Sequence, residues 1–189
     1  MSSGGDVIVA GGGSPGARKE RAAQIGRLYQ AAPELRVPIW IDAYGEPMET
    51  PLRLDDLGDG YKIIFAFQHW CPGCQSGGFP TLQRLYRALK GRGFGFAAIQ
   101  TVFAGEAVNT VDTSLRTNQE QYGLPIPFGH DLPLDGDRRP SFIEDYRSAG
   151  TPWFTVIDPS GQVVFADFRL DADRFPAALD IGSLAIESA

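Results

Sequence analysis

The strongest constraint on the fold is an apolar, strand-like run that leads directly into a pair of cysteines. Residues 61–68 are nearly all apolar, which is typical of a strand covered on both faces in a mostly parallel sheet. Cys71 and Cys74 follow at once and are the only cysteines among the 189 residues. Residues 79–90 then carry apolar side chains at helical spacing, and a second apolar run covers residues 94–102. Because a crossover helix joins parallel strands, this order predicts an α/β fold.

The remaining patterns extend this unit into a central mixed sheet flanked by helices. Pro159 and Gly161 mark a type I turn between two strands, which predicts an antiparallel hairpin. Ser141 has the side chain and position of an N-cap for a short helix. In addition to the first unit we expect strands at residues 37–41, 153–157 and 162–168, and helices at residues 113–122, 141–146 and 172–179.

Composition divides the chain into two parts. Residues 1–33 are an N-terminal extension, partly disordered or carrying one short helix, because a Gly/Ser-rich stretch precedes helix-forming residues that end at Pro33. Residues 34–189 form one domain.

Gly11, Gly13 and Gly16 also match the spacing of a dinucleotide-binding loop. The strand before them is very short and a flexible leader has the same composition, so dinucleotide binding is the weaker interpretation.

Charge and hydropathy exclude two classes of partner. The chain has 17 Lys and Arg residues against 23 Asp and Glu residues, so it lacks the basic surface expected of a nucleic-acid-binding protein. No apolar run approaches the roughly 18 to 20 residues needed to span a bilayer, and the first thirty residues lack a signal-peptide core. We therefore expect no membrane span and a cytoplasmic location. A mis-assigned start or a removed leader would make the location periplasmic or extracytoplasmic.

The position of the two cysteines predicts redox chemistry. Cys71 would lie where a helix begins, and the free amides and positive dipole end there favour a thiolate. Cys74 would lie one turn later, within disulfide reach and more shielded from solvent. Cys71 can then attack a disulfide and Cys74 can resolve the mixed disulfide without a cofactor. A zinc site would need two further ligands, for which only His69 and His130 are available among histidines, so we predict no metal.

Several motifs between residues 36 and 180 resemble the thioredoxin superfamily, and within it the TlpA-like thiol-disulfide oxidoreductases of the redoxin group. The resemblance implies a thioredoxin-like fold with the Cys-x-x-Cys motif at a helix N-terminus. It also implies that Pro152 is a cis-proline facing the disulfide and that Thr151 offers backbone groups to an extended partner peptide. The motifs that carry it are Trp70-Cys71-Pro72-Gly73-Cys74, the helix proline Pro80, Tyr122-Gly123-Leu124, and Gly150-Thr151-Pro152 before residues 155–161.

The sequence departs from related families at three places. Thioredoxins carry a buried aspartate six residues before the first cysteine, whereas this chain has Phe65 there, so proton transfer to Cys74 needs another group or water. Peroxiredoxins carry a proline and a threonine or serine where this chain has Ile64 and Gln68, which weakens a peroxidase interpretation. Pro80 lies six residues after Cys74 instead of five, which predicts an irregular helical turn behind the motif.

Two neighbours of Cys71 complete the candidate site. His69 is a candidate for proton transfer or thiolate stabilisation, although at the end of a strand it is equally compatible with a solvent-facing position. Trp70 is expected to pack beside the disulfide and shape the surface that a partner meets.

Together these residues predict a thiol-disulfide oxidoreductase that exchanges disulfides with protein or small thiol partners. A reducing partner such as a thioredoxin or glutathione system would regenerate it. Two alternatives stay open: a peroxide reductase that uses Cys71, and a non-catalytic binding module with a structural disulfide. In a reducing cytosol the protein would act mainly as a reductant.

Overall fold

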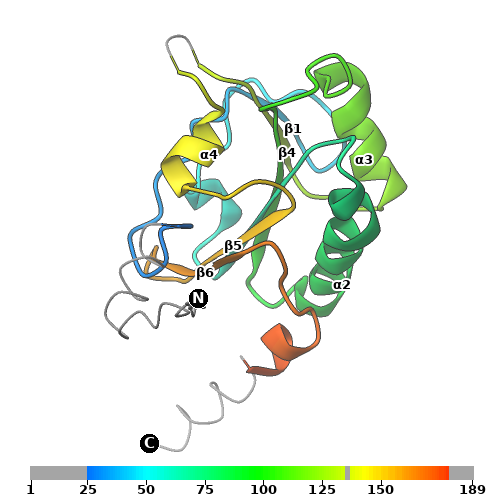
Figure 1. Cartoon of the computed structure of the whole chain (residues 1–189). Helices are drawn as coiled ribbons and strands as arrows, with labels where there is room; N and C mark the ends of the chain where they lie inside the picture. Colours follow the sequence, from blue (N-terminus) through cyan, green and yellow to red (C-terminus); the bar gives the residue numbers. More distant parts are fainter. Residues whose placement is uncertain (1–24, 135–136, 179–189) are drawn as a thin grey trace, which may run out of the picture.

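A six-stranded mixed sheet with helices on both faces forms the body of the chain, which confirms the predicted architecture (Figure 1). The computed structural model describes residues 25–134 and 137–178. The strands are β1 (Ile39–Ile41), β2 (Lys62–Phe67), β3 (Gly95–Thr101), β4 (Phe128–Asp131), β5 (Trp153–Ile157) and β6 (Val163–Asp167). The helices are α2 (Phe79–Leu89), α3 (Arg116–Gln121) and α4 (Ser141–Tyr146), with shorter helical turns at η1 (Asp55–Leu57), η2 (Cys74–Gly78) and η3 (Val111–Leu115). Residues 174–178 are also helical, within the helix predicted at residues 172–179.

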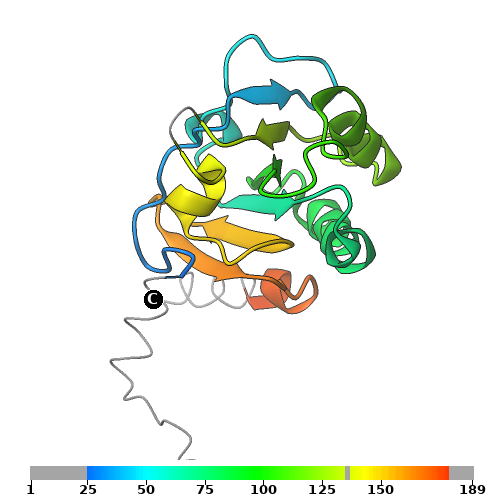
Figure 2. The same cartoon turned by 45° about the horizontal axis from the view of Figure 1, so that its top comes forward.

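Strand order places β2 near the centre of the sheet. The order is β1-β4-β3-β2-β5-β6, and β2, β3 and β4 run parallel while β1, β5 and β6 run antiparallel to their neighbours. Figure 2 shows this succession from β1 to β6 across the sheet. The predicted hairpin is present, because the amide of Gly161 donates to the carbonyl of Asp158 over 2.9 Å in the turn between β5 and β6. Because β2 is hydrogen-bonded to β3 on one side and β5 on the other, its C-terminal end is held firmly in the sheet. The cysteine motif that follows β2 is positioned by that end.

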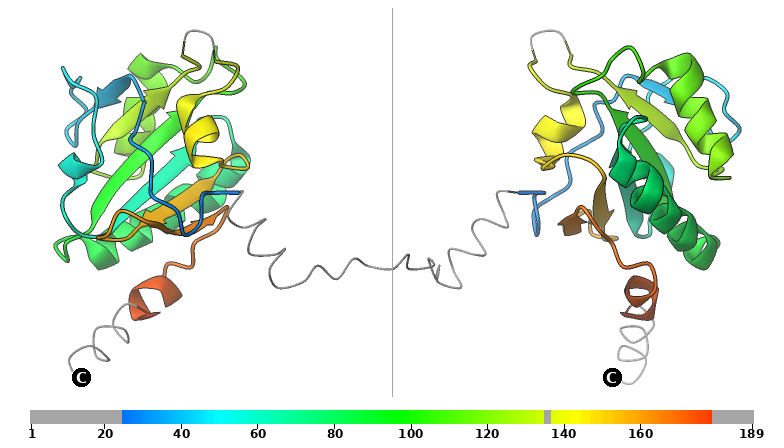
Figure 3. Two further views of the ribbon diagram at one scale, coloured as in Figure 1. Left: turned by 90° about the vertical axis from the view of Figure 1, so that its left-hand side faces the viewer. Right: turned by 45° about the vertical axis from the view of Figure 1, so that its right-hand side comes forward.

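Alternate residues of β2 supply two hydrophobic cores. Ile63, Phe65 and Phe67 face the core shared with α2 and with the residues that flank α3, such as Leu115 and Tyr122. Ile64 and Ala66 face the opposite core, which α4 and the segment before β1 cover. Figure 3 shows α2 and α4 on opposite faces of the sheet. The near absence of polar residues in this strand is thereby explained, because every β2 side chain is buried.

The start of α4 is capped differently from the sequence prediction. Ser141 is the first helical residue and makes no N-cap bond of its own; Pro140 occupies the cap position. The buried carboxylate of Asp131 accepts hydrogen bonds from the amides of Ser141 and Phe142 at 3.0 and 2.9 Å. A residue of β4 therefore caps α4, and the assignment of Ser141 as N-cap is wrong, because a partner ten residues earlier supplies the acceptor.

Residues 25–33, which the sequence analysis assigns to the extension, lie against the edge of the sheet. The amide of Tyr29 donates to the carbonyl of Val163 over 2.7 Å, and Ala31 pairs with Gln162. This segment therefore covers part of the open edge of β6. The glycine motif at residues 11–16 lies outside the described residues.

The described helices are short. The longest, α2, has 11 residues. Across residues 25–134 and 137–178, no helix has both the length and the apolar character that a membrane crossing requires.

Candidate active site

Cys71 and Cys74 lie where β2 gives way to the helical segment that continues into α2. Residues 72 and 73 are helical, and the irregular turn η2 begins at Cys74. Both cysteines are free thiols; Cys71 is 8% exposed and Cys74 is fully buried. The amide of Cys74 donates to Sγ of Cys71 over 3.3 Å. This bond directs a backbone hydrogen-bond donor at the Cys71 sulfur, at the helix start where the sequence places that residue.

Cys74 has the environment of a protonated thiol. Burial raises the pKa of Cys74, and its hydrogen bond with Cys71 raises it further. Hydrogen bonds with the backbone of Gln68 and with Thr151 lower the pKa of Cys74, but by less. The two thiols are therefore unequal, with the more accessible Cys71 suited to attack and Cys74 suited to resolution.

This inequality predicts selective alkylation. In the reduced protein at pH 8, iodoacetamide is expected to modify Cys71 at least about tenfold faster than Cys74, because only a thiolate with access to reagent reacts. Peptide mapping by mass spectrometry at several times measures both rates on one sample. Equal rates in the folded protein would contradict the assignment of roles.

The turn behind the cysteines is irregular, as the spacing to Pro80 predicted. Residues Cys74–Gly78 form a π-helical turn, after which α2 continues as a regular helix. Gly78 has no room for a side chain, since a Cβ there would lie 2.6 Å from the ring of Phe65 and 3.1 Å from Pro152. Gly77, in contrast, has open space where a Cβ would point. The extra residue is thus absorbed locally, and the helix approaches Pro152 closely.

The loop before β5 closes over Cys71. The peptide bond between Thr151 and Pro152 is cis, as the resemblance implied. Sγ of Cys71 lies 3.7 Å from the carbonyl oxygen of Thr151. A Cβ on Gly73 would meet the Pro152 ring at 3.3 Å. Thr151 and Pro152 therefore lie directly against the motif, where a clamp for a partner peptide is predicted.

Trp70 is a surface side chain held by the loop after β3. The residue is 48% exposed, and its Nε1 donates to the side chain of Gln68 and to the carbonyl of Ala104. Asn109, a buried residue that the sequence analysis did not single out, accepts from the amide of His69 over 2.7 Å and donates to the carbonyls of Ala104 and Gly105. Asn109 therefore fixes this loop beside the cysteine motif.

The side chain of His69 belongs to a chain of hydrogen bonds. Its Nδ1 lies 2.9 Å from Nδ2 of Asn118, whose Oδ1 accepts from Gln75 over 3.1 Å. The oxygen of Gln75 in turn accepts from the hydroxyl of Tyr122 over 2.7 Å. Since Nδ2 of Asn118 can only donate, this contact uses Nδ1 of His69 as an acceptor. His69 is half-buried in this network instead of facing freely into solvent.

His130 is buried in β4, a different strand from β2, which leads to the cysteines. Its Nδ1 lies 2.9 Å from the side-chain amide of Gln100. Burial lowers the pKa of His130 below its ordinary value of 6.5. The unfolded chain therefore binds a proton at pH values where the folded chain does not.

The expected consequence is a loss of stability in mild acid. Between pH 7.5 and pH 5.5 the free energy of unfolding should fall by up to about 1 kcal/mol through His130, since stability is lost as pH drops below the unfolded pKa. Urea unfolding across this range measures the slope, and a His130→Gln variant should show a flatter one. Measurements above pH 8, where the imidazole is neutral in both states, give the baseline cost of the substitution. An unchanged slope in the variant would contradict this role.

Phe65 fills the place where thioredoxins carry a buried aspartate. It is fully buried, and its ring lies 5.0 Å from that of Phe79 and 4.8 Å from that of Phe154, measured between centroids. The groups that shift the pKa of Cys74 in the described chain belong to Cys71, Gln68 and Thr151, and none of these is a carboxylate. Resolution by Cys74 must therefore proceed without a carboxylate at this position.

Comparison with solved structures gives several similar proteins, although no family model and no curated protein sequence matches the chain. A thioredoxin-like superfamily protein is 30% identical, with a TM-score of 0.68 over 80% of this chain and 94% of its own. A thiol-disulfide isomerase from Corynebacterium glutamicum is 28% identical, with a TM-score of 0.63 over 81% of this chain and 96% of its own. The thioredoxin domain of a thiol-disulfide oxidoreductase from Bacteroides vulgatus is 22% identical, with a TM-score of 0.56 over 77% of this chain and 91% of its own; it supports the fold alone.

Proposed function

Because this chain belongs to the thioredoxin-like superfamily, we propose that it is a thiol-disulfide oxidoreductase that acts through Cys71 and Cys74. The observation that carries the proposal is the unequal cysteine pair beside the cis-Pro152 loop. Sγ of Cys71 accepts an amide hydrogen bond from Cys74, while burial raises the pKa of Cys74. We therefore assign Cys71 as the nucleophile that attacks the substrate disulfide and Cys74 as the thiol that resolves the mixed disulfide.

The first step forms a mixed disulfide. The thiolate of Cys71 attacks one sulfur of a substrate R–S–S–R′, so that the Cys71–S–S–R bond forms and the S–S bond to R′ breaks. R′ leaves as a thiolate. The amide of Cys74 stabilises the attacking sulfur before this step, and the loop at Thr151 and Pro152 holds the substrate segment against it.

The second step releases the substrate as a dithiol. Cys74 loses its proton and attacks Sγ of Cys71, which forms the Cys71–Cys74 disulfide and expels R as a thiolate. We assign the departing R′ thiolate as the acceptor of the Cys74 proton, because Phe65 leaves no carboxylate at the thioredoxin position. The substrate gains two electrons and the protein loses two. A thiol reductant of the glutathione or thioredoxin type returns the pair to its reduced state.

The direction of exchange follows the surroundings of the protein. In a reducing compartment such as the cytoplasm, the pair is kept as a dithiol and reduces its partners. We assign the chain to the TlpA-like group on the motifs around Cys71, Tyr122 and Pro152. In an extracytoplasmic compartment, the reduction potentials of the partners present there would decide whether the same pair oxidises or reduces them.

Turnover on defined substrates tests the proposal. The reduced protein is assayed with hydroxyethyl disulfide and with a disulfide-containing protein, each coupled to a glutathione reducing system, and the same sample is assayed for hydrogen peroxide consumption. We expect catalytic turnover of disulfides and slow reaction with peroxide, because Ile64 and Gln68 replace the peroxidase residues.

Two outcomes would replace the proposal with an alternative. Rapid peroxide consumption with a sulfenic acid on Cys71 would favour a peroxide reductase. Absence of turnover, with a Cys71–Cys74 disulfide that resists reduction in the folded protein, would favour a binding module with a structural disulfide.

A further inference from the structure

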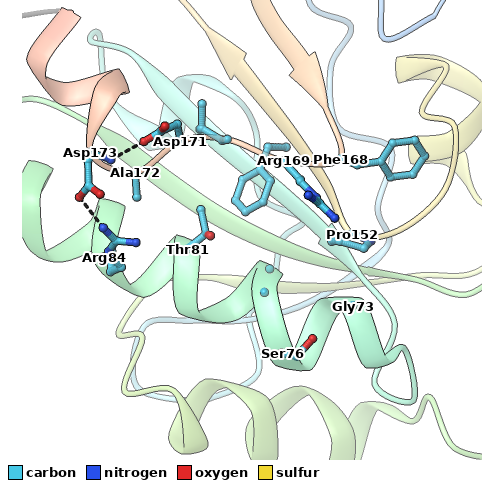
Figure 4. A pocket seen from close by; sticks show the side chains of 14 residues that line it. Gly73, Ser76, Thr81, Arg84, Pro152, Phe168, Arg169, Asp171, Ala172 and Asp173 are labelled. Atoms are coloured by element: carbon cyan, nitrogen blue, oxygen red, sulfur yellow. Dashed lines mark hydrogen bonds and ion pairs between the residues drawn. The ribbon is translucent and has the colours of Figure 1, made fainter.

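A cleft of about 720 Å³ begins at the cysteine motif and runs along α2 (Figure 4). Gly73 and Pro152 line one end, beside the reactive sulfur, and Arg84 and Asp173 line the other. Its far wall is the segment after β6, which includes Phe168 and Arg169. The cleft therefore begins at residues next to the site of disulfide exchange, since the carbonyl oxygen of Thr151, the residue before Pro152, lies 3.7 Å from Sγ of Cys71.

The irregular turn η2 forms part of the cleft wall. Ser76 and Gly77 line the cleft, and Gly77 has no neighbour within 4 Å of the position of a Cβ. On the opposite wall the Phe168 ring is anchored edge-on against Trp153, with 4.9 Å between centroids, and remains 41% exposed. Gly77 leaves room for the backbone of an extended peptide, and the exposed Phe168 ring offers an apolar surface for one of its side chains.

The charges of the cleft leave one cation without a partner. Arg84 and Asp173 neutralise each other in an ion pair. The carboxylate of Asp171 accepts from the amides of Asp173 and Arg174 at 3.0 and 2.9 Å. Arg169 makes no hydrogen bond or ion pair with any residue of the described chain, and Figure 4 shows its guanidinium directed toward Pro152. The end of the cleft nearest Cys71 therefore offers a positive charge.

The length of the cleft distinguishes a peptide from a small thiol. From position 73 to position 84 a helix advances roughly 16 Å, which corresponds to about five residues of extended chain. A molecule of the size of glutathione would fill only part of this length. The exposed aromatic ring and open glycine along the cleft provide contacts for the remainder.

We propose that the cleft binds an extended segment of a partner protein that carries an acidic side chain near its reactive cysteine, and that Arg169 recognises this carboxylate. The inference rests on the proposed function, since the cleft leads to Cys71. Arg169 is a specificity residue here, because a guanidinium and a carboxylate form charge-assisted hydrogen bonds that an amide cannot match.

The test compares matched peptide disulfides. Seven-residue peptides with a central cysteine joined to 2-mercaptoethanol carry either Glu or Gln two positions before or after that cysteine. The reduced protein is mixed with each peptide in a single turnover, and the second-order rate constant is measured for wild type, Arg169→Gln, Arg169→Glu and the control Arg87→Glu. Arg87 is an exposed cation of α2 that does not line the cleft. Glutathione disulfide and neutral hydroxyethyl disulfide are run alongside.

We expect wild type to prefer one of the Glu peptides over its Gln counterpart by about three- to fivefold at low ionic strength. The ratio should fall to about one in Arg169→Gln, fall below one in Arg169→Glu, and remain at the wild-type value in Arg87→Glu.

Three results would overturn the inference. The first is a wild-type ratio near one for every peptide pair, with hydroxyethyl disulfide still reduced; the proposed function would then stand without this specificity. The second is a ratio that Arg169→Glu leaves unchanged while its reaction with glutathione disulfide slows, which would assign the cleft to a small thiol. The third is failure of wild type to reduce any probe, which would remove the proposed function as well.

Discussion

Replacement of Cys71 with serine is expected to abolish disulfide turnover. The hydroxyl cannot form the mixed disulfide, so the loss in kcat/KM should be roughly a thousandfold or more, as for other covalent nucleophiles. The fold should persist, because serine is close in size to cysteine and the site is 8% exposed. The assay is reduction of hydroxyethyl disulfide by purified variant and wild type at equal concentration, with circular dichroism to verify the fold.

Replacement of Cys74 with serine provides the matched control. Attack by Cys71 remains possible in that variant, but resolution does not, so a mixed disulfide with the substrate should accumulate. Intact-mass spectrometry detects it as a mass increase equal to one substrate thiol, which dithiothreitol removes. Full activity in Cys71→Ser, a substrate adduct on Cys74 in Cys71→Ser, or absence of an adduct on Cys71 in Cys74→Ser would contradict the assigned roles.

Introduction of an aspartate at Phe65 is expected to destabilise the protein severely. The ring is fully buried and packs against the rings of Phe67, Phe79 and Phe154, whose side chains have no hydrogen-bonding group. A carboxylate there loses its hydration without a partner, so Phe65→Asp should cost about 4 kcal/mol or more in unfolding free energy. Phe65→Leu, which keeps the site apolar, should cost only about 1 to 2 kcal/mol.

The pH dependence of Phe65→Asp supplies a second measurement. Burial would raise the pKa of the introduced carboxyl above that in the unfolded chain, so the variant should lose stability as pH rises above about 4. Urea unfolding at pH 5 and pH 8 should therefore show a smaller deficit from wild type at pH 5. A deficit below about 2 kcal/mol at both pH values would mean that this face of the sheet accommodates a carboxylate, as in thioredoxins.

The parts of the fold that the sequence predicted are those with a local signal. The apolar run before Cys71 identified β2, because a strand buried on both faces has no polar alternation to obscure it. The position of Pro80, six residues after Cys74 instead of five, predicted the irregular turn, because one additional residue in a helix must widen a turn. The cis peptide at Pro152 came from the resemblance, since X-Pro bonds are cis in only a small minority of cases.

The features that the sequence did not predict depend on partners distant in the chain. The N-terminus of α4 is capped by Asp131, which belongs to β4. The hydrogen-bond partner of the His69 side chain is Asn118, 49 residues later. Asn109 has no distinguishing sequence pattern, and its role follows only from its hydrogen bonds to His69 and Ala104. The cleft at Arg169 likewise exists only because the segment after β6 lies beside α2. Residue spacing along the chain carries no record of such contacts.

A redox titration of the cysteine pair tests the central claim most directly. The folded protein is equilibrated with graded ratios of reduced to oxidised glutathione, quenched with acid and alkylated, and the Cys71–Cys74 disulfide is quantified by mass spectrometry. We expect a reversible two-electron transition to one intramolecular disulfide, with the fold intact in both the reduced and the oxidised protein. A pair that is not reduced until the protein unfolds, or that never forms the intramolecular disulfide, would contradict it.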